Sequence, residues 1–276
     1  MSTHPSTTAA PEKARRSQTI ITVASGKGGV GKTMVSTTLA HSLAFAGERT
    51  LLVDCDLGLA NVDVQLGIMP EHDLASVVAG TTAFEDATIR VSSDESKSAR
   101  GSFDVIAGSS GSGNLGALAR TELARLRQGL TLIAAHYDRV IVDLAAGVDP
   151  AVTMFASIEG PTLVVVTDEP TSITDAYAFI KVASMTPRDD GTAADIRIVV
   201  NMAETIEAGR KTYEALSRAC GNFLGITPPL AGIVPRDTAV RDAVRHQTPL
   251  LTRSPNAKAG AAISKIADGI RTRSAK

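Results

Sequence analysis

The sequence predicts an α/β fold in a single domain: a mostly parallel, twisted β-sheet covered by helices on both faces. The chain has 276 residues, which is enough for one such domain with a good core and too few for two domains and a linker. Hydrophobic residues make up 43% of the chain, but aromatic residues only 3%, and Trp is absent. The core must therefore consist of Val, Ile, Leu and Ala, a composition typical of a parallel sheet buried under helices.

Composition also restricts the class of function. The formal net charge is −1, so a strongly basic nucleic-acid binder is excluded on overall charge, and we expect no direct nucleic-acid binding. The two cysteines, Cys55 and Cys220, are far apart in sequence and lack metal-site spacing, which favours packing roles in a reduced, cytoplasmic setting. No apolar run approaches the roughly 18 residues that span a bilayer, and no signal-peptide pattern is present.

The chain begins with a segment that we expect to be disordered. Residues 1–18 are rich in Ser, Thr, Pro and Ala and show no apolar periodicity. The pattern changes at residues 19–33, where a β-branched run leads into a glycine-rich turn and then into an amphipathic segment, residues 31–46, that ends at Gly47. Strand, glycine-rich loop and helix in this order are typical of a loop that cradles phosphates.

The glycine-rich loop has the side chains that phosphate binding requires. Its glycines let the backbone approach a polyphosphate closely, so that N–H groups and the helix N-terminus point at its oxygens. Lys32 would reach the β- and γ-phosphates, and the Thr33 hydroxyl would bind Mg²⁺, a hard cation that takes oxygen ligands. The flanking strand and helix argue against a merely flexible, solvated loop. The expected nucleotide contacts here are Gly28, Gly29, Val30, Gly31, Lys32, Thr33 and Met34.

Two later strands end in acids. Residues 49–56 form an apolar run that ends in Asp54 and Asp56, which point the same way in strand geometry. Beside a phosphate loop, such a pair can hold Mg²⁺ through water or orient an attacking water, whereas in isolation it could be a solvated turn. Residues 139–148 form another strand that ends in Asp143 and then a turn of small residues. Asp143 is a carboxylate placed to approach Mg²⁺, and the amide of Gly147 in the turn could face the γ-phosphate.

The rest of the chain continues the alternation of strands and helices. We expect strands at residues 103–107, 162–167 and 196–200, short helices near 74–79 and 84–89, and longer helices ending near 136, starting near an N-cap at Thr171 or Ser172, and covering about 206–220 and 256–270. Asn201 follows the strand at 196–200. Its carboxamide offers a donor and an acceptor, which suits adenine, although Asn is also common in turns.

These motifs resemble those of the MinD/ParA superfamily of P-loop ATPases. Residues 26–33 read Gly-Lys-Gly-Gly-Val-Gly-Lys-Thr, the deviant P-loop with an extra lysine; residues 54–67 are similar to the Asp-x-Asp signature of the MinD branch; and residues 143–147 keep the frame Asp-x-x-Ala-Gly. The resemblance implies a slow, partner-stimulated ATPase that uses ATP and Mg²⁺ and forms a homodimer with ATP.

The resemblance also implies a role for each residue that matches a motif. Lys27 would reach across the dimer to the partner's nucleotide, and Asp56 would activate the hydrolytic water. The implied catalytic residues are Lys27, Lys32 and Asp56; the implied metal-site residues are Thr33, Asp54 and Asp143; and the implied base contacts are Asn201, Pro235 and Asp237.

Residues 169–177 narrow the resemblance within the superfamily. The string Glu-Pro-Thr-Ser-Ile-Thr-Asp-Ala-Tyr is similar to that of the flagellar-number regulators named FlhG, FleN or YlxH. That branch implies regulation of flagellar number or placement, with a signal-recognition-type GTPase and a flagellar transcriptional activator as partners. Residues 1–18 lack the Asp-Gln-Ala-x-x-Leu-Arg motif with which some members dock flagellar switch components.

Other functions remain open at this point. A positioning ATPase of the same superfamily could act on another cargo, such as a chemotaxis array or a chromosome. The chain could also be a binding module that antagonises a transcriptional activator. An electron-transfer P-loop protein would need cysteine ligands for its cluster, and Cys55 and Cys220 provide no such set.

The C-terminal segment, residues 255–276, is expected to form a basic helix and tail beyond an ATPase domain at 19–254. From Arg253 onward the chain has six basic residues and one acid, Asp268. Three isoleucines, Ile263, Ile266 and Ile270, fall on one helical stripe, which more often packs on a domain than enters a membrane. The family commonly carries a C-terminal membrane-targeting helix, so the resemblance implies a weak peripheral membrane contact for this tail.

Overall fold

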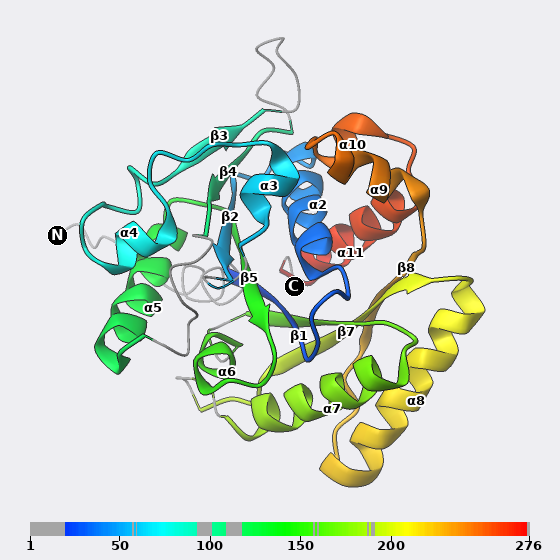
Figure 1. The fold of residues 1–276 in the computed structure, drawn as a ribbon. Helices are drawn as coiled ribbons and strands as arrows, with labels where there is room; N and C mark the ends of the chain where they lie inside the picture. The colour runs from blue at the N-terminus through cyan, green and yellow to red at the C-terminus, as the bar shows by residue number, and fades with distance from the viewer. Residues whose placement is uncertain are drawn as a thin grey trace, which may run out of the picture.

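The core of the structure is an eight-stranded sheet in which all strands but one are parallel (Figure 1). The structure is a computed structural model and describes residues 20–56, 58, 60–92, 101–108, 118–156, 158, 160–186, 188 and 191–274; the tail predicted at residues 1–18 lies outside these. The strands are β1 (Ile20–Ser25), β2 (Thr50–Cys55), β3 (Ile89–Val91), β4 (Phe103–Ile106), β5 (Arg139–Ala146), β6 (Pro161–Val166), β7 (Asp195–Ala203) and β8 (Leu230–Pro235). Within the described residues their order is β3-β4-β2-β5-β1-β6-β7-β8, and only the edge strand β3 is antiparallel to its neighbour.

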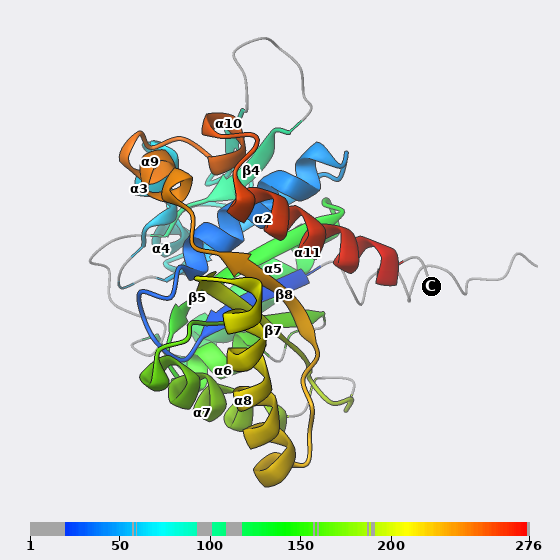
Figure 2. The same ribbon diagram turned by 90° about the vertical axis from the view of Figure 1, so that its right-hand side faces the viewer.

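Helices cover both faces of this sheet (Figures 1 and 2). They are α2 (Lys32–Phe45), α3 (Val62–Leu66), α4 (Leu74–Val78), α5 (Arg120–Ala134), α6 (Pro150–Ala156), α7 (Pro170–Met185), α8 (Ile206–Leu224), α9 (Thr238–Arg245), α10 (Leu250–Arg253) and α11 (Lys258–Ser274). One hydrophobic cluster joins the sheet to α2, α10 and α11, and the other joins its opposite face to α4–α8. The predicted fold class is confirmed.

The central strand β1 shows how the sequence produces this arrangement. All six of its residues are buried, as a β-branched run between two helical layers requires. Ile21 and Val23 face the cluster that contains α2, whereas Ile20 and Ala24 face the other cluster. β1 lies between β5 and β6, so the chain leaves it toward one half of the sheet and later crosses to the other half. In open parallel sheets, ligands bind at the carboxyl ends of strands beside such a reversal of strand order.

Three local predictions were wrong. The strand expected to end in Asp143, β5, continues to Ala146. The N-cap of α7 is Glu169, and neither Thr171 nor Ser172 takes this position, because Pro170 occupies the first helical turn, where its missing N–H does no harm. Ser172 instead accepts a hydrogen bond from the Thr167 amide. The helix predicted near 84–89 is a turn that leads into β3, a short strand defined by its pairing with β4 and not by a local pattern.

The C-terminal helix α11 packs on the domain. It packs against α2, which it crosses in the view of Figure 2, and Ile263, Ile266 and Ile270 are at most 3% exposed in the same cluster as that helix. Near its end, Arg271 pairs with Glu48 at 3.2 Å, and Glu48 also pairs with Arg139 at 3.0 Å. Among the described residues, none of the helices combines the length and the apolar character needed to cross a membrane.

His41 on α2 makes the stability of this face depend on pH. It is 1% exposed, neither ring nitrogen has a hydrogen-bond partner, and its ring stacks on Phe45 with a centroid distance of 4.6 Å. Burial lowers the pKa of His41 to about 4. Because the unfolded chain binds this proton near pH 6.5, the unfolded state gains protons first, and stability is lost as the pH falls from about 6.5 toward 4.

We predict that His41→Leu will reduce the loss of stability in this pH range. With Leu at this position, neither the native nor the unfolded state binds this proton. The variant should therefore avoid a loss of unfolding free energy on the order of 3 kcal/mol between pH 7 and pH 4. Urea unfolding of both proteins at several pH values measures it, and the difference between the two curves separates His41 from the carboxylates. Parallel curves would contradict the prediction.

Candidate nucleotide-binding site

The loop between β1 and α2, which we call the phosphate cradle, lies at the carboxyl edge of the sheet (Figure 1). Gly29 and Gly31 have φ values of 80° and 82°, in the left-handed region that favours glycine, and Gly31 is the N-cap of α2. Gly28 and Gly29 are exposed, and a Cβ atom placed on either would meet nothing within 4 Å. The first N–H groups of the 14-residue helix α2 follow directly. An anion can therefore approach the backbone closely at the positive end of a helix.

Beneath this loop lies a buried group of charges. Lys32 Nζ is 3.0 Å from Asp143 Oδ1, and the Ser36 hydroxyl donates to the same oxygen at 2.9 Å. Asp54 is paired in register with Asp143 on the neighbouring strand. All three charged side chains are less than a tenth exposed. Ser36 was not predicted, although it lies one helical turn after Lys32 and therefore on the same side of α2.

Electrostatics keep Lys32 charged. Burial alone would lower the pKa of Lys32, but the charge and hydrogen bond of Asp143, with Asp56 and Asp54 nearby, outweigh burial and hold that pKa above its ordinary value. Burial and the neighbouring Asp143 raise the pKa of Asp54. The positive charge of Lys32 acts in the opposite direction on the pKa of Asp54 and offsets part of the repulsion between the two carboxylates.

Asp143 also has a carboxylate oxygen that fits a further cation or water. Its Oδ2 atom is buried and has no hydrogen-bond partner. Thr33 lies in the first turn of α2, half-buried, directly after Lys32. In the part of the chain that the structure describes, no group of three His, Cys, Asp or Glu side chains could hold a metal alone. A magnesium ion would fit here in the way it commonly binds nucleotide sites, with few protein oxygens and with phosphate and water as its other ligands.

Asp54 has a structural task that the sequence did not indicate. Its carboxylate accepts hydrogen bonds from the amides of Asp56, Asn61 and Val62 at 3.0, 3.1 and 3.2 Å. These bonds fix the segment after β2, which carries the half-buried Asp56; residues 57 and 59 lie outside the described part of the chain. Asp54 therefore holds Asp56 beside the phosphate loop, and its role at a magnesium ion stays a prediction.

Lys27 makes two contacts that were not predicted. Its ammonium donates to Glu169 Oε2 at 2.6 Å and to Thr171 Oγ1 at 2.9 Å, at the start of α7. The hydrogen bond and charge of Lys27 lower the pKa of Glu169. Because β1 and β6 are neighbours, the loops after these two strands meet, and an acid just after β6 was the available signal. In this conformation the Lys27 side chain is 37% exposed and held within its own subunit.

The predicted base contacts lie on β7, β8 and the segment that follows. Asn201 is 1% exposed near the end of β7, and its Nδ2 donates to the carbonyl oxygen of Val30 at 2.8 Å. Pro235 ends β8 and pairs with Ala203. Asp237 caps α9 and also accepts from the Ala259 amide at the start of α11, at 3.0 and 3.1 Å. The contacts of these residues with a base stay predictions, as does that of Met34, which is buried in α2.

The Gly147 amide does not face the place of a γ-phosphate, the position considered for it from the sequence. It donates to the Ser25 carbonyl oxygen at 2.9 Å, and its φ is 112°. In this conformation the amide is therefore engaged by β1 and does not face the phosphate cradle. A turn of the peptide, which glycine permits, would be needed to free it.

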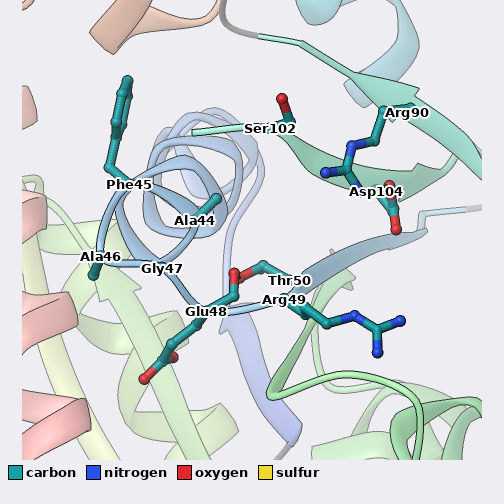
Figure 3. A pocket seen from close by; sticks show the side chains of 10 residues that line it. All are labelled: Ala44, Phe45, Ala46, Gly47, Glu48, Arg49, Thr50, Arg90, Ser102 and Asp104. Carbon is teal, nitrogen blue, oxygen red and sulfur yellow. Dashed lines mark hydrogen bonds and ion pairs between the residues drawn. The ribbon is translucent and has the colours of Figure 1, made fainter. Parts of the chain in front are cut away.

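A separate hollow of about 450 Å³ lies at the other end of the sheet (Figure 3). It is bordered by the last turn of α2, the start of β2, and Arg90, Ser102 and Asp104 near β3 and β4. Arg90 and Asp104 pair with each other at 3.0 Å. None of the predicted nucleotide-site residues borders this hollow, so it is distinct from the phosphate cradle.

Comparison with known proteins agrees with this geometry. Residues 21–250 match the family described as the CobQ/CobB/MinD/ParA nucleotide binding domain. The chain is 38% identical to the antiactivator FleN of Pseudomonas aeruginosa over 91% of this chain and 85% of that protein, and 28% identical to the flagellum site-determining protein YlxH of Helicobacter pylori over 90% and 80%.

Solved structures show the same fold. The septum site-determining protein MinD from Pyrococcus horikoshii, solved in complex with Mg-ADP, superimposes with a TM-score of 0.68 and 23% identity over 92% of this chain and 96% of that one. The family match covers the cradle, the buried charges and β7 together. This chain therefore belongs to the CobQ/CobB/MinD/ParA nucleotide-binding family.

Proposed function

We propose that this chain is an ATP-dependent, dimerising switch ATPase that regulates flagellar number or placement. The observation that carries the proposal is the 38% identity to FleN along nearly the whole chain, since a match of this extent includes both the nucleotide site and the surfaces around it. The name YlxH, a flagellum site-determining protein, points to the same process. The ligand would be ATP with Mg²⁺, in accordance with the Mg-ADP bound to a protein of the same fold.

Different residues of the chain would bind the phosphates, hold the metal ion and orient the attacking water. The glycine backbone and Lys32 bind the phosphates, and Asp143 keeps Lys32 charged and in place at 3.0 Å. Thr33 and Asp143 would hold Mg²⁺, which supplies charge neutralisation on the phosphate oxygens when bound. Asp54 fixes the segment that carries Asp56, and Asp56 would orient the attacking water.

Lys27 would connect nucleotide binding to dimerisation. In the subunit described here its ammonium is held by Glu169 and Thr171. To reach a partner's phosphates it must leave both, so dimer closure exchanges an intramolecular ion pair for an intermolecular one. The exchange is feasible because the pair is exposed and therefore weak.

The partners are proposed at the level of class. The word antiactivator in the name of FleN supports a transcriptional activator as one partner, and the family implies a signal-recognition-type GTPase as another. Any membrane contact through α11 would be electrostatic and weak, because its isoleucine stripe is buried and its exposed residues include the acid Asp268 beside the basic Lys258 and Lys265.

Two substitutions separate binding from hydrolysis. We predict that Lys32→Ala abolishes ATP binding and dimerisation, whereas Asp56→Ala retains both and lowers hydrolysis by about a hundredfold or more, as expected on loss of a group that orients the nucleophile. Size-exclusion chromatography with Mg-ATP and a phosphate-release assay measure the two effects. If Asp56→Ala ran as a monomer with ATP, the role given to Asp56 would be excluded.

A second pair of substitutions tests Lys27. Lys27→Ala should keep ATP binding and lose partner-stimulated hydrolysis, because the group that reaches the other subunit is missing. Glu169→Gln keeps Lys27 but weakens its hold, so the ATP dimer should form at a protein concentration lower by a few-fold, the modest change expected for an exposed pair. Sedimentation velocity over a concentration series measures this. An unchanged or weaker dimer in Glu169→Gln would rule out the exchange described above.

The cellular function is tested by counting flagella. Cells that lack the gene should carry an altered number of flagella or place them differently, and the Asp56→Ala variant should fail to restore the count. Electron microscopy of individual cells gives the distribution. A normal count would favour a positioning ATPase for another cargo.

A further inference from the structure

The end of β7 lies against the phosphate loop. The pairing of β7 with β8 shifts register between Val200 and Ala203, so the two residues between them leave the regular ladder. Met202 has a φ of 55°, a left-handed conformation that non-glycine residues seldom adopt. Strained backbone of this kind persists where the surrounding structure holds it, and it is common at functional sites.

Gly31 shows how tight this contact is. A Cβ atom at residue 31 would lie 2.4 Å from Asn201 Nδ2 and 3.0 Å from Met202 Cε. A side chain here would displace the hydrogen-bonded carboxamide of Asn201, so packing favours glycine at this position, as does its φ of 82°. The loop therefore rests directly on the carboxamide of Asn201.

A hydrogen bond fixes this contact. Asn201 Nδ2 donates to the carbonyl oxygen of Val30 at 2.8 Å, and both residues are at most 3% exposed. The next carbonyl, that of Gly31, accepts the first helical hydrogen bond of α2, from Val35. The Val30 carbonyl precedes the helix and receives a side-chain donor in its place. Without that donor, a buried acceptor would lose its partner.

We propose that Asn201 is a positioning residue for the phosphate loop: through Val30 it holds the cradle in its binding conformation whether or not a base is present. The inference rests on the proposed function in taking residues 26–33 as the phosphate site. One N–H of the carboxamide is used by Val30, which leaves the second N–H and the oxygen for a base. The same side chain thus couples binding of the base to binding of the triphosphate.

The test uses a ligand without a base. Inorganic tripolyphosphate with Mg²⁺ can contact the loop but not the base position, and its affinity is measured by isothermal titration calorimetry on the full chain. Asn201→Ala removes the donor, and Asn201→Asp keeps the size but places an oxygen opposite the Val30 carbonyl. The control is Thr205→Ala, which removes the N-cap of α8 without touching the loop. We expect both Asn201 variants, and not the control, to lose about three- to tenfold in affinity for tripolyphosphate, the range for one lost buried hydrogen bond.

Hydrogen exchange on the nucleotide-free proteins provides a second measurement. Amides of residues 26–33 should exchange faster in both Asn201 variants than in the wild type and in Thr205→Ala, while strands remote from the loop keep their protection. If tripolyphosphate affinity and the hydrogen exchange of the loop amides are both unchanged while ATP affinity falls, Asn201 contacts only the base and the inference is overturned. If the wild type binds neither ATP nor tripolyphosphate, the proposed function fails, and the exchange measurement alone decides the role of Asn201.

Discussion

The buried pair of Lys32 and Asp143 is the interaction on which this edge of the sheet depends. It joins the first turn of α2 to the middle of the sheet, and both side chains are almost completely removed from water. A buried charge without its partner is far more costly than an exposed one, so replacing either residue alone would lower the stability of this edge. The pair also favours the position of Asp54 beside Asp143, because the charge of Lys32 offsets part of the repulsion between two neighbouring carboxylates. The position of Asp56 follows, since Asp54 holds the segment that carries it.

The conformation of the phosphate loop is set by the elements that pack against its two ends. On one side Gly26 lies against the backbone of α7, where an added Cβ would be 2.1 Å from the Asp175 carbonyl group. On the other side Gly31 lies against Asn201. The cradle is therefore shaped by β6 with α7 and by β7, the elements that follow β1 across the sheet. Its glycines serve packing as much as backbone flexibility.

The sequence was informative wherever a function depends on a local pattern. The strand, glycine loop and helix at residues 19–46 and the acids Asp54, Asp56 and Asp143 could be predicted because each lies in or directly after a buried run, although β5 continues beyond Asp143 to Ala146. The contacts between these parts could not. Lys27 and Glu169 are 142 residues apart, and they meet only because β1 and β6 pair. Likewise, Asp237 caps α9 and contacts α11 because of where β8 ends, and β3 exists only through its pairing with β4. To predict such contacts, one must know the order of the strands in the sheet, which no local sequence pattern predicts.

The course of α11 has a practical consequence for experiments. The helix begins next to Asp237, at the carboxyl edge of the sheet, and its last turns reach Glu48 at the opposite edge. The first described residue, Ile20, opens β1 at that same opposite edge. Both ends of the folded body thus emerge away from the phosphate loop. A label attached at this opposite edge of the sheet, beside Ile20 or Glu48, would leave the surface around Lys27 accessible to a second subunit.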